Sequence, residues 1–223
     1  LPAILGNIKF CKKDITAFRP DVLVLIDYPG FNLRLVKWAK ENGLKVVFYI
    51  SPQVWAWKES RVELIKKYVD KMIVILPFEK EFYKKWNYDV EYVGHPLVEV
   101  IEEFQRNNYV NEEAIKSPTI ALLPGSRKQE ILKKLPIMLK VARHFQGYKF
   151  IVAKAPGLPD EFYDELLKPY NNVGVVTNQT YELLSHAKAA LVTSGTATLE
   201  TALFSVPEII CYKGNPISYQ IAK

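Results

Sequence analysis

The sequence predicts an α/β protein of two domains, each with a mainly parallel sheet, that face each other across a cleft. Three observations favour this class. Short apolar runs rich in β-branched residues alternate with longer charged stretches whose apolar residues recur at helical spacing. A polar segment near the middle divides the chain into two pieces of about 100 residues each, a common domain size. Two glycine-containing turns in the second half each link an apolar strand to a helix.

Nine apolar runs are predicted to be strands because they are short and end in charged, proline or turn residues. In chain order they cover residues 22–26, 45–50, 72–76, 91–93, 119–123, 149–153, 173–176, 189–192 and 209–212. The stretches between them have apolar residues at i, i+3 and i+4, which predicts helices over residues 33–42, 58–68, 79–86, 129–145, 160–168, 180–187 and 196–204. This alternation is typical of parallel strands joined by crossover helices.

The domain boundary is predicted after the turn Gly94-His95-Pro96, where the chain becomes polar and loses a strong period. We therefore predict a first domain over residues 1–97, a linker over 98–116 and a second domain over 117–223. Ligands of such α/β proteins bind at the carboxyl ends of the strands, so the chemistry is expected there.

Composition excludes several other classes. With 49% hydrophobic and 24% charged residues, the chain suits packed cores and not disorder or fibres. No apolar run approaches the ~20 residues of a membrane-spanning helix. Cys11 and Cys211 stand far apart, which argues against a disulfide framework or a zinc site and fits a reducing compartment.

The net charge of +6 and the pI near 9.1 favour an anionic partner. Nucleic acid, an acidic membrane surface and a phosphorylated small molecule all satisfy that charge. The lysines are scattered over many segments and no DNA- or RNA-binding motif is recognisable, so we predict no nucleic-acid partner.

The first glycine-containing turn follows the strand at 119–123 and includes Gly125, Ser126 and Arg127. Ser126 and Gln129 have the spacing of a capping box, which predicts a helix start at this point. Glycine permits close backbone approach, free helix amides attract an anion, and the guanidinium of Arg127 can bind two phosphate oxygens. We interpret the turn as a diphosphate site, although an ordinary turn with a solvated arginine explains these residues equally well.

The second turn follows the strand at 189–192, and Ser194, Gly195 and Thr196 again place hydroxyls and a glycine at a helix start. Glu200 comes one helical turn after Thr196, so its carboxylate can reach a ligand there and accept hydrogen bonds from a ribose diol. Helix capping with a dipole-stabilising glutamate explains this turn more simply when it is taken alone. Two such turns in one domain favour a sugar nucleotide.

Asp27 follows the strand at 22–26 and is the candidate general base of the first domain. Pro29 and Gly30 make a rigid turn that holds the carboxylate at the strand end, where it can take a proton from an attacking hydroxyl. A turn-forming or helix-capping aspartate is the alternative, and for this segment alone it is the commoner one.

Trp55 and Trp57 flank one alanine on the loop after residues 45–50. Such a pair can stack on a sugar, meet acyl chains at a membrane interface, or fill the domain core. The predicted helix at 79–86 is apolar with a basic rim, which suits a membrane interface and equally an ordinary packed helix whose lysines reach solvent.

The histidines His95, His144 and His186 are scattered, without the spacing to carboxylates that metal sites use. We therefore predict no bound metal and no cofactor, and we assign His95 no chemistry.

Taken together, five segments resemble the lipid-A-disaccharide synthase family, a family of GT-B glycosyltransferases with two Rossmann-like domains. They are IDYPGFN at residues 26–32, SPQVWAW at 51–57, VGHPL at 93–97, LLPGSR at 122–127 and SGTATLE at 194–200. Their order also matches, and the resemblance extends over essentially the whole chain. SPQVWAW is its most specific part, whereas the last two segments are shared more loosely with other GT-B enzymes, including nucleotide-sugar epimerases.

The resemblance implies an inverting, metal-free transfer of diacylglucosamine from UDP to a glucosamine-1-phosphate lipid, which forms the β-1,6 disaccharide of lipid A at the cytoplasmic face of the inner membrane. It implies that Asp27 is the base and that Trp55 and Trp57 are candidates for contact with the lipid acceptor. The implied contacts to UDP-sugar are Gly125, Ser126, Arg127, Ser194, Gly195, Thr196 and Glu200.

The resemblance also implies an opening strand before Leu1 and closing helices after Lys223, so we expect the first domain to be incomplete and the second to lack its end. Two other functions stay open. One is an enzyme like UDP-N-acetylglucosamine epimerase, which needs the same anion-binding turns but no membrane. The other is a catalytically inert module that binds a membrane surface or a partner.

Overall fold

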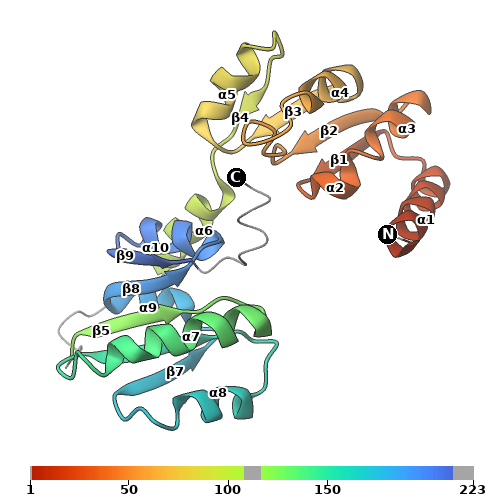
Figure 1. Ribbon diagram of the computed structural model, residues 1–223. Helices are drawn as coiled ribbons and strands as arrows, with labels where there is room; N and C mark the ends of the chain where they lie inside the picture. The colour runs from red at the N-terminus through yellow and green to blue at the C-terminus, as the bar shows by residue number, and fades with distance from the viewer. Residues whose placement is uncertain (1, 108–116, 213–223) are drawn as a thin grey trace. The chain divides into compact units, whose positions relative to one another are not determined.

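The computed structural model describes residues 2–107 and 117–212, and the chain divides into two compact units, Leu1–Pro96 and Leu97–Lys223 (Figure 1). Each unit contains one parallel sheet with helices packed on it, which confirms the predicted α/β class. Each unit is described by itself below.

The first unit has a four-stranded sheet in the order β1-β2-β3-β4, with every pair of neighbours parallel. Its strands are β1 (Val22–Ile26), β2 (Lys45–Tyr49), β3 (Lys71–Val74) and β4 (Glu91–Tyr92). Its helices are α1 (Pro2–Phe18), α2 (Pro29–Asn32), α3 (Val36–Glu41), α4 (Arg61–Tyr68) and α5 (Pro77–Lys84). Alternate strand residues, among them Leu25, Phe48 and Met72, join the helices in one buried cluster because successive side chains point to opposite faces.

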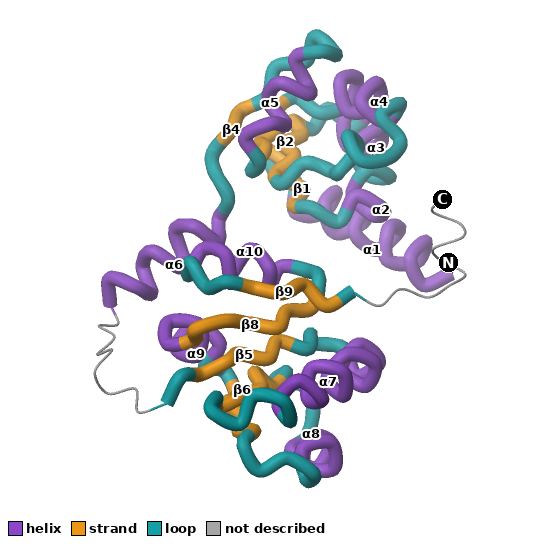
Figure 2. The backbone as a smooth tube through the Cα atoms, turned by 60° about the vertical axis from the view of Figure 1, so that its left-hand side comes forward, coloured by secondary structure: helices purple, strands orange, loops and turns teal. Residues whose placement is uncertain are grey.

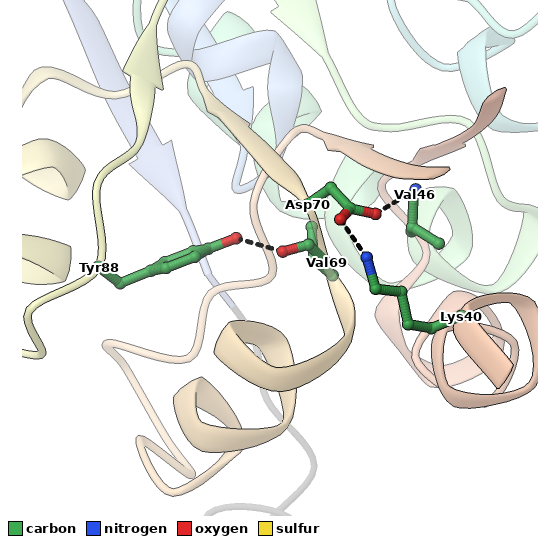
Figure 3. Close-up of polar contacts among 5 residues, drawn as sticks. All are labelled: Lys40, Val46, Val69, Asp70 and Tyr88. Carbon is green, nitrogen blue, oxygen red and sulfur yellow. Dashed lines mark hydrogen bonds and ion pairs between the residues drawn. The ribbon is translucent and has the colours of Figure 1, made fainter. Parts of the chain in front are cut away.

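Asp70 fixes the point where β3 begins beside β2 (Figure 3). Its amide donates to the carbonyl of Val46 at 2.9 Å, and its Oδ2 accepts from the amide of Val46 at 2.8 Å. Lys40 pairs with the other carboxylate oxygen, and the hydroxyl of Tyr88 donates to the carbonyl of Val69 at 3.1 Å. Burial raises the pKa of Asp70, but Lys40 and the Val46 amide outweigh it and leave this pKa below its usual value. The ionised carboxylate therefore ties α3 to the sheet.

The second unit has a five-stranded parallel sheet in the order β7-β6-β5-β8-β9. Its strands are β5 (Thr119–Leu123), β6 (Lys149–Lys154), β7 (Val173–Thr177), β8 (Ala187–Thr193) and β9 (Glu208–Cys211). Its helices are α6 (Pro96–Asn107), which starts at the last residue of the first unit, α7 (Lys128–Ala142), α8 (Asp160–Leu167), α9 (Thr180–His186) and α10 (Thr196–Leu203). All nine predicted strands are confirmed, with ends shifted by at most two residues.

The central strand β5 is buried on both faces of this sheet. Leu122 packs in the cluster formed with α7 and α8, whereas Ala121 and Leu123 pack in the cluster formed with α9 and α10. Figure 2 shows the two helix layers on opposite sides of the sheet. This arrangement places the ends of β5 and β8, and the turns that follow them, side by side.

Two helices depart from the prediction in the first unit. The helix predicted over 33–42 is shortened to α3, because residues 33–35 form turns, and the short helix α2 starts before it at Pro29. Helix α1 was not predicted, although Ile4, Ile8, Cys11 and Ile15 recur at helical spacing and form its more buried side. Gly6 within that stretch weakens its local helix preference.

Helix α6 replaces the first part of the predicted linker. Residues 98–107 of the segment 98–116 are helical, and residues 108–116 lie outside the described part of the chain. Ile101 is buried, and the ring of Phe104 contacts those of Tyr181 and Phe204 at 5.4 and 5.9 Å between centroids. This segment therefore packs on the second unit through an apolar stripe. The charged residues between its apolar ones made the segment look like a polar linker in the sequence.

Candidate functional site

A pocket of about 280 Å³ opens in the second unit at the carboxyl ends of β5, β6 and β8. Among its lining residues are six of the seven residues predicted to contact a nucleotide: Gly125, Ser126, Ser194, Gly195, Thr196 and Glu200. The two glycine-containing turns are about 70 positions apart in the chain, and they meet because β5 and β8 are neighbours in the sheet.

Gly125 shapes the first turn of the pocket. Its φ of +102° lies in the region that side-chain-bearing residues rarely adopt. A Cβ at this position would also lie 2.9 Å from Oε2 of Glu130 and 3.5 Å from Cγ2 of Thr193. The turn therefore needs a glycine for its backbone, whereas the Glu130 carboxylate is the end of a flexible side chain and can move aside.

Arg127 is the seventh predicted residue, and it does not line the pocket. Its side chain is 82% exposed, and Nη1 lies 3.3 Å from Oε1 of Glu130. It is also the N-cap of α7, which begins at Lys128, so the predicted capping box of Ser126 and Gln129 is wrong. The carbonyl of Arg127 accepts the amide of Glu130 at 2.9 Å, and no side chain caps the helix.

The second turn ends at Gly195, the N-cap of α10, which has φ 156° and ψ −160°, a conformation that is essentially confined to glycine. No side chain caps this helix either. The hydroxyl of Thr198 donates a hydrogen bond to the carbonyl of Gly195 at 2.7 Å. Thr196 and Ala197 of the first helical turn line the pocket. The first amides of an α-helix lack intrahelical partners, so this end of α10 is suited to an anion.

Glu200 lines the same pocket one turn further along α10. Burial raises the pKa of its carboxyl, and a hydrogen bond with the hydroxyl of Tyr181 partly counteracts that rise. The pKa of Tyr181 is also raised, first by its burial and then by the charge of Glu200. Tyr181 therefore orients the carboxylate within the pocket wall.

The other residues that line the pocket were not predicted from the sequence, and the polar ones among them are Glu130, Lys154, Thr180 and Thr193. The side chain of Lys154 is only 9% exposed, pairs with Asp160, and has its ammonium 5.7 Å from the ring centre of Tyr163. It ends β6, the neighbour of β5, so only the strand order could have indicated it. Thr193 directly precedes Ser194, and its burial was not apparent from the motif.

Asp27 lies in the first unit immediately after β1, with an exposed side chain. It and Tyr28 have φ of 44° and 42°, two consecutive residues in the left-handed region. The side-chain amide of Asn32 donates to the carbonyls of Asp27 at 2.7 Å and of Ile26 at 3.0 Å, and the Asp27 amide donates to the carbonyl of Tyr49 at 2.9 Å. Such strained backbone is held in place by its surroundings and clusters at functional sites.

The aromatic candidates of the first unit have different environments. Trp55 is half-buried and packs edge-on against Phe78, with 5.0 Å between ring centroids, which supports a partly structural role. Trp57 is 75% exposed. In α5, Tyr83 is fully buried and its hydroxyl lies 2.7 Å from Oγ of Ser51, so this helix packs on the core in the ordinary way.

Within residues 2–107 and 117–212, no group of three or more His, Cys, Asp or Glu side chains is placed to hold a metal ion. In the same part of the chain, every helix is too short or too polar to cross a bilayer.

The sequence profile of the lipid-A-disaccharide synthetase family matches residues 1–223. The chain is 41% identical over 232 residues to a lipid-A-disaccharide synthase of Syntrophus aciditrophicus, covering 100% of the chain and 61% of that protein. It is also 41% identical over 211 residues to the synthase of Coxiella burnetii strain CbuK_Q154, covering 92% and 56%. The chain thus spans about three fifths of the length of these curated relatives.

Two solved structures resemble both units of the fold. One is the UDP complex of Staphylococcus aureus MnaA, with a TM-score of 0.69, 11% identity, and coverage of 99% of this chain and 66% of that one. The other is UDP-GlcNAc 2-epimerase of Neisseria meningitidis bound to UDP-GlcNAc, with a TM-score of 0.66, 14% identity, and coverage of 98% and 67%. At such low identity these structures show the fold alone, and they confirm the predicted GT-B class.

Proposed function

This chain belongs to the lipid-A-disaccharide synthetase family, and from that premise we propose that it serves as an inverting glycosyltransferase of lipid A synthesis. In this reaction diacylglucosamine passes from UDP to a glucosamine-1-phosphate lipid, and the β-1,6 disaccharide and UDP are released. The observation that carries the proposal is the single pocket that gathers six predicted nucleotide contacts from two distant turns.

In the proposed complex the diphosphate lies between the two turns. Amides near Gly125 and at the start of α10 donate to its oxygens, and Glu200 accepts hydrogen bonds from the ribose hydroxyls. Arg127 is exposed and pairs with the pocket residue Glu130. In the proposed complex a change of side-chain rotamer moves its guanidinium from Glu130 to a phosphate oxygen. The net charge of +6 suits such an anionic substrate.

The proposed chemistry is a direct displacement at the anomeric carbon. Asp27 takes the proton of the acceptor hydroxyl, whose oxygen forms the new bond while the bond between sugar and phosphate breaks. Negative charge then builds on the leaving UDP, where preorganised donors stabilise it by about 3 kcal/mol per well-placed group. The donors named here act without a metal or cofactor.

The epimerase alternative rests on fold likeness alone, since the solved epimerases cited above are at most 14% identical to the chain. The family match favours the transferase. Incubation of the protein with UDP-N-acetylglucosamine separates the two, because an epimerase converts the sugar without an acceptor. Binding to vesicles without any binding of UDP would instead favour an inert surface-binding module.

We further propose that the protein works at the cytoplasmic face of the inner membrane, since the proposed donor and acceptor are both lipids. The exposed indole of Trp57 is suited to the interface, where one end of the ring is apolar and the other polar. Cosedimentation with anionic vesicles is expected to fall severalfold for Trp57→Ala. The control is Phe145→Ala, another exposed aromatic residue in the second unit, and equal binding by all three proteins would contradict the role of Trp57.

Arg127→Ala is expected to weaken UDP binding by about tenfold or more, because a guanidinium that binds two phosphate oxygens is lost. The unfolding temperature should barely change, since the side chain is 82% exposed. Calorimetric titration with UDP measures the first effect and thermal unfolding the second. Arg143→Ala removes the same charge from the other end of α7 and should bind UDP as the wild type does. Unchanged affinity in Arg127→Ala would remove this residue from the site.

A further inference from the structure

Glu130 brings a negative charge to the pocket that is proposed to hold a diphosphate. It is the third residue of α7 and lines the pocket, with a side chain that is 33% exposed. Its Oε2 lies 2.9 Å from the position that a Cβ on Gly125 would take, so this oxygen borders the first of the two turns suited to an anion. A carboxylate therefore lies beside the amides that are proposed to bind phosphate oxygens.

The other charges around this turn do not favour an anion either. Nη1 of Arg127 contacts Oε1 of Glu130 at 3.3 Å, and the carboxylate of this pair lines the pocket whereas the guanidinium does not. The charged side chains among the lining residues are those of Glu130, Lys154 and Glu200. Of these, Lys154 already pairs with Asp160. A diphosphate that enters the pocket therefore meets carboxylates and an arginine that is already paired.

Stabilisation of the helix start does not require this placement. A glutamate in the first turn of a helix interacts favourably with the helix dipole wherever its side chain points. Glu182 is the third residue of α9, as Glu130 is of α7, and it is exposed and is not among the pocket residues. The contact between Arg127 and Glu130 is a largely exposed ion pair, which contributes little to stability. The position of the Glu130 carboxylate in the pocket wall therefore calls for a role in ligand binding.

We propose that Glu130 competes with the diphosphate of UDP for Arg127, so that it lowers the affinity for the nucleotide and speeds the release of UDP after transfer. The inference rests on the proposed function and adds to it the control of product release at the same site. When UDP binds, its phosphate oxygens take the guanidinium from Glu130, and the carboxylate left behind repels them. Because product release limits the turnover of many enzymes, a less tightly held UDP favours turnover.

Glu130→Gln tests the inference because glutamine keeps the shape of glutamate and removes its charge. The variant is expected to bind UDP and pyrophosphate about tenfold more tightly in calorimetric titrations. Fluorescently labelled UDP, chased with unlabelled UDP, should leave the variant more slowly than the wild type. A purely structural role predicts the opposite sign, since a loosened start of α7 weakens binding. Glu182→Gln removes the same charge from the same position of α9 and is the matched control, which should bind both ligands as the wild type does.

The Arg127→Ala background tests whether Glu130 acts through the arginine. In that background Glu130→Gln should tighten binding less than it does in the wild type, because it relieves the repulsion but frees no guanidinium. An equal gain in both backgrounds would overturn the competition for Arg127.

An affinity of Glu130→Gln equal to or weaker than that of the wild type would overturn the inference, and a loss would mean that Glu130 orients Arg127 toward the phosphate. The proposed function fails separately: a wild type that binds pyrophosphate but not UDP contradicts the nucleotide assignment, while the pyrophosphate arm still tests Glu130. A wild type that binds neither ligand overturns both.

Discussion

Replacing Asp27 with asparagine is expected to lower the turnover number of the full-length enzyme by 10²–10⁴-fold, the usual contribution of a general base. The change removes the proton acceptor and little else. Asparagine tolerates the left-handed region better than most residues, so the φ of 44° and the carbonyl contacts of Asn32 should persist. The measurement is the initial rate of disaccharide formation from UDP-diacylglucosamine and the monosaccharide lipid.

The matched control for this prediction is Asp21→Asn, an exposed aspartate at the opposite end of β1. It loses the same charge from the same strand and should turn over as the wild type does. UDP affinity should be unchanged in both variants, because the proposed nucleotide contacts all belong to the second unit. If Asp27→Asn keeps a rate near that of the wild type, the base has to be sought elsewhere.

Replacing Gly125 with alanine is expected to reduce UDP affinity by about a hundredfold or more. The φ of +102° is strained for any side chain, and the new Cβ would meet the carboxylate of Glu130 at 2.9 Å. Relief of the backbone strain moves the turn whose amides are proposed to bind the diphosphate, whereas the Glu130 side chain can rotate away. The change is also expected to destabilise the second unit by about 1–3 kcal/mol, which urea unfolding measures.

Two further variants show whether the effect of Gly125→Ala comes from this turn. Gly147→Ala places a methyl in open space in the same unit and should leave UDP binding intact. Glu130→Ala combined with Gly125→Ala removes the carboxylate contact but not the backbone strain, so a partial recovery would show how much each contributes. Wild-type affinity in Gly125→Ala itself would mean that this turn does not hold the diphosphate.

The strands were predictable because parallel strands buried by helices need short, continuous apolar runs, and all nine occur where the sequence indicates. Helix α6 was missed because charged residues separate its apolar ones, and helix α1 was missed because Gly6 weakens its local helix preference. The start of α7 was predicted to within one residue, but its cap was wrong: the spacing of Ser126 and Gln129 fits a capping box, whereas Arg127 is the N-cap and no side chain caps the helix.

The candidate site was predictable only where a local motif carries it. Glycine at Gly125 and Gly195 follows from turns that require unusual backbone angles, and a carboxylate one turn into α10 follows from helical spacing. Lys154 has no such motif, since it reaches the pocket by ending the strand next to β5. The exposure of Arg127 depends on the direction of α7 relative to the turn before it. The residues next to Arg127 in the sequence do not determine that direction.

By itself, the sequence determined the α/β class, the strands, the family and the two turns suited to an anion, because each of these depends on residue types a few positions apart. Only the tertiary structure decided that both turns border one pocket and that Lys154 and Thr193 share its wall. These features depend on the order β6-β5-β8, which brings together segments about 30 to 70 positions apart. That order results from burying both faces of the sheet at once, a property of the whole unit and not of any single segment.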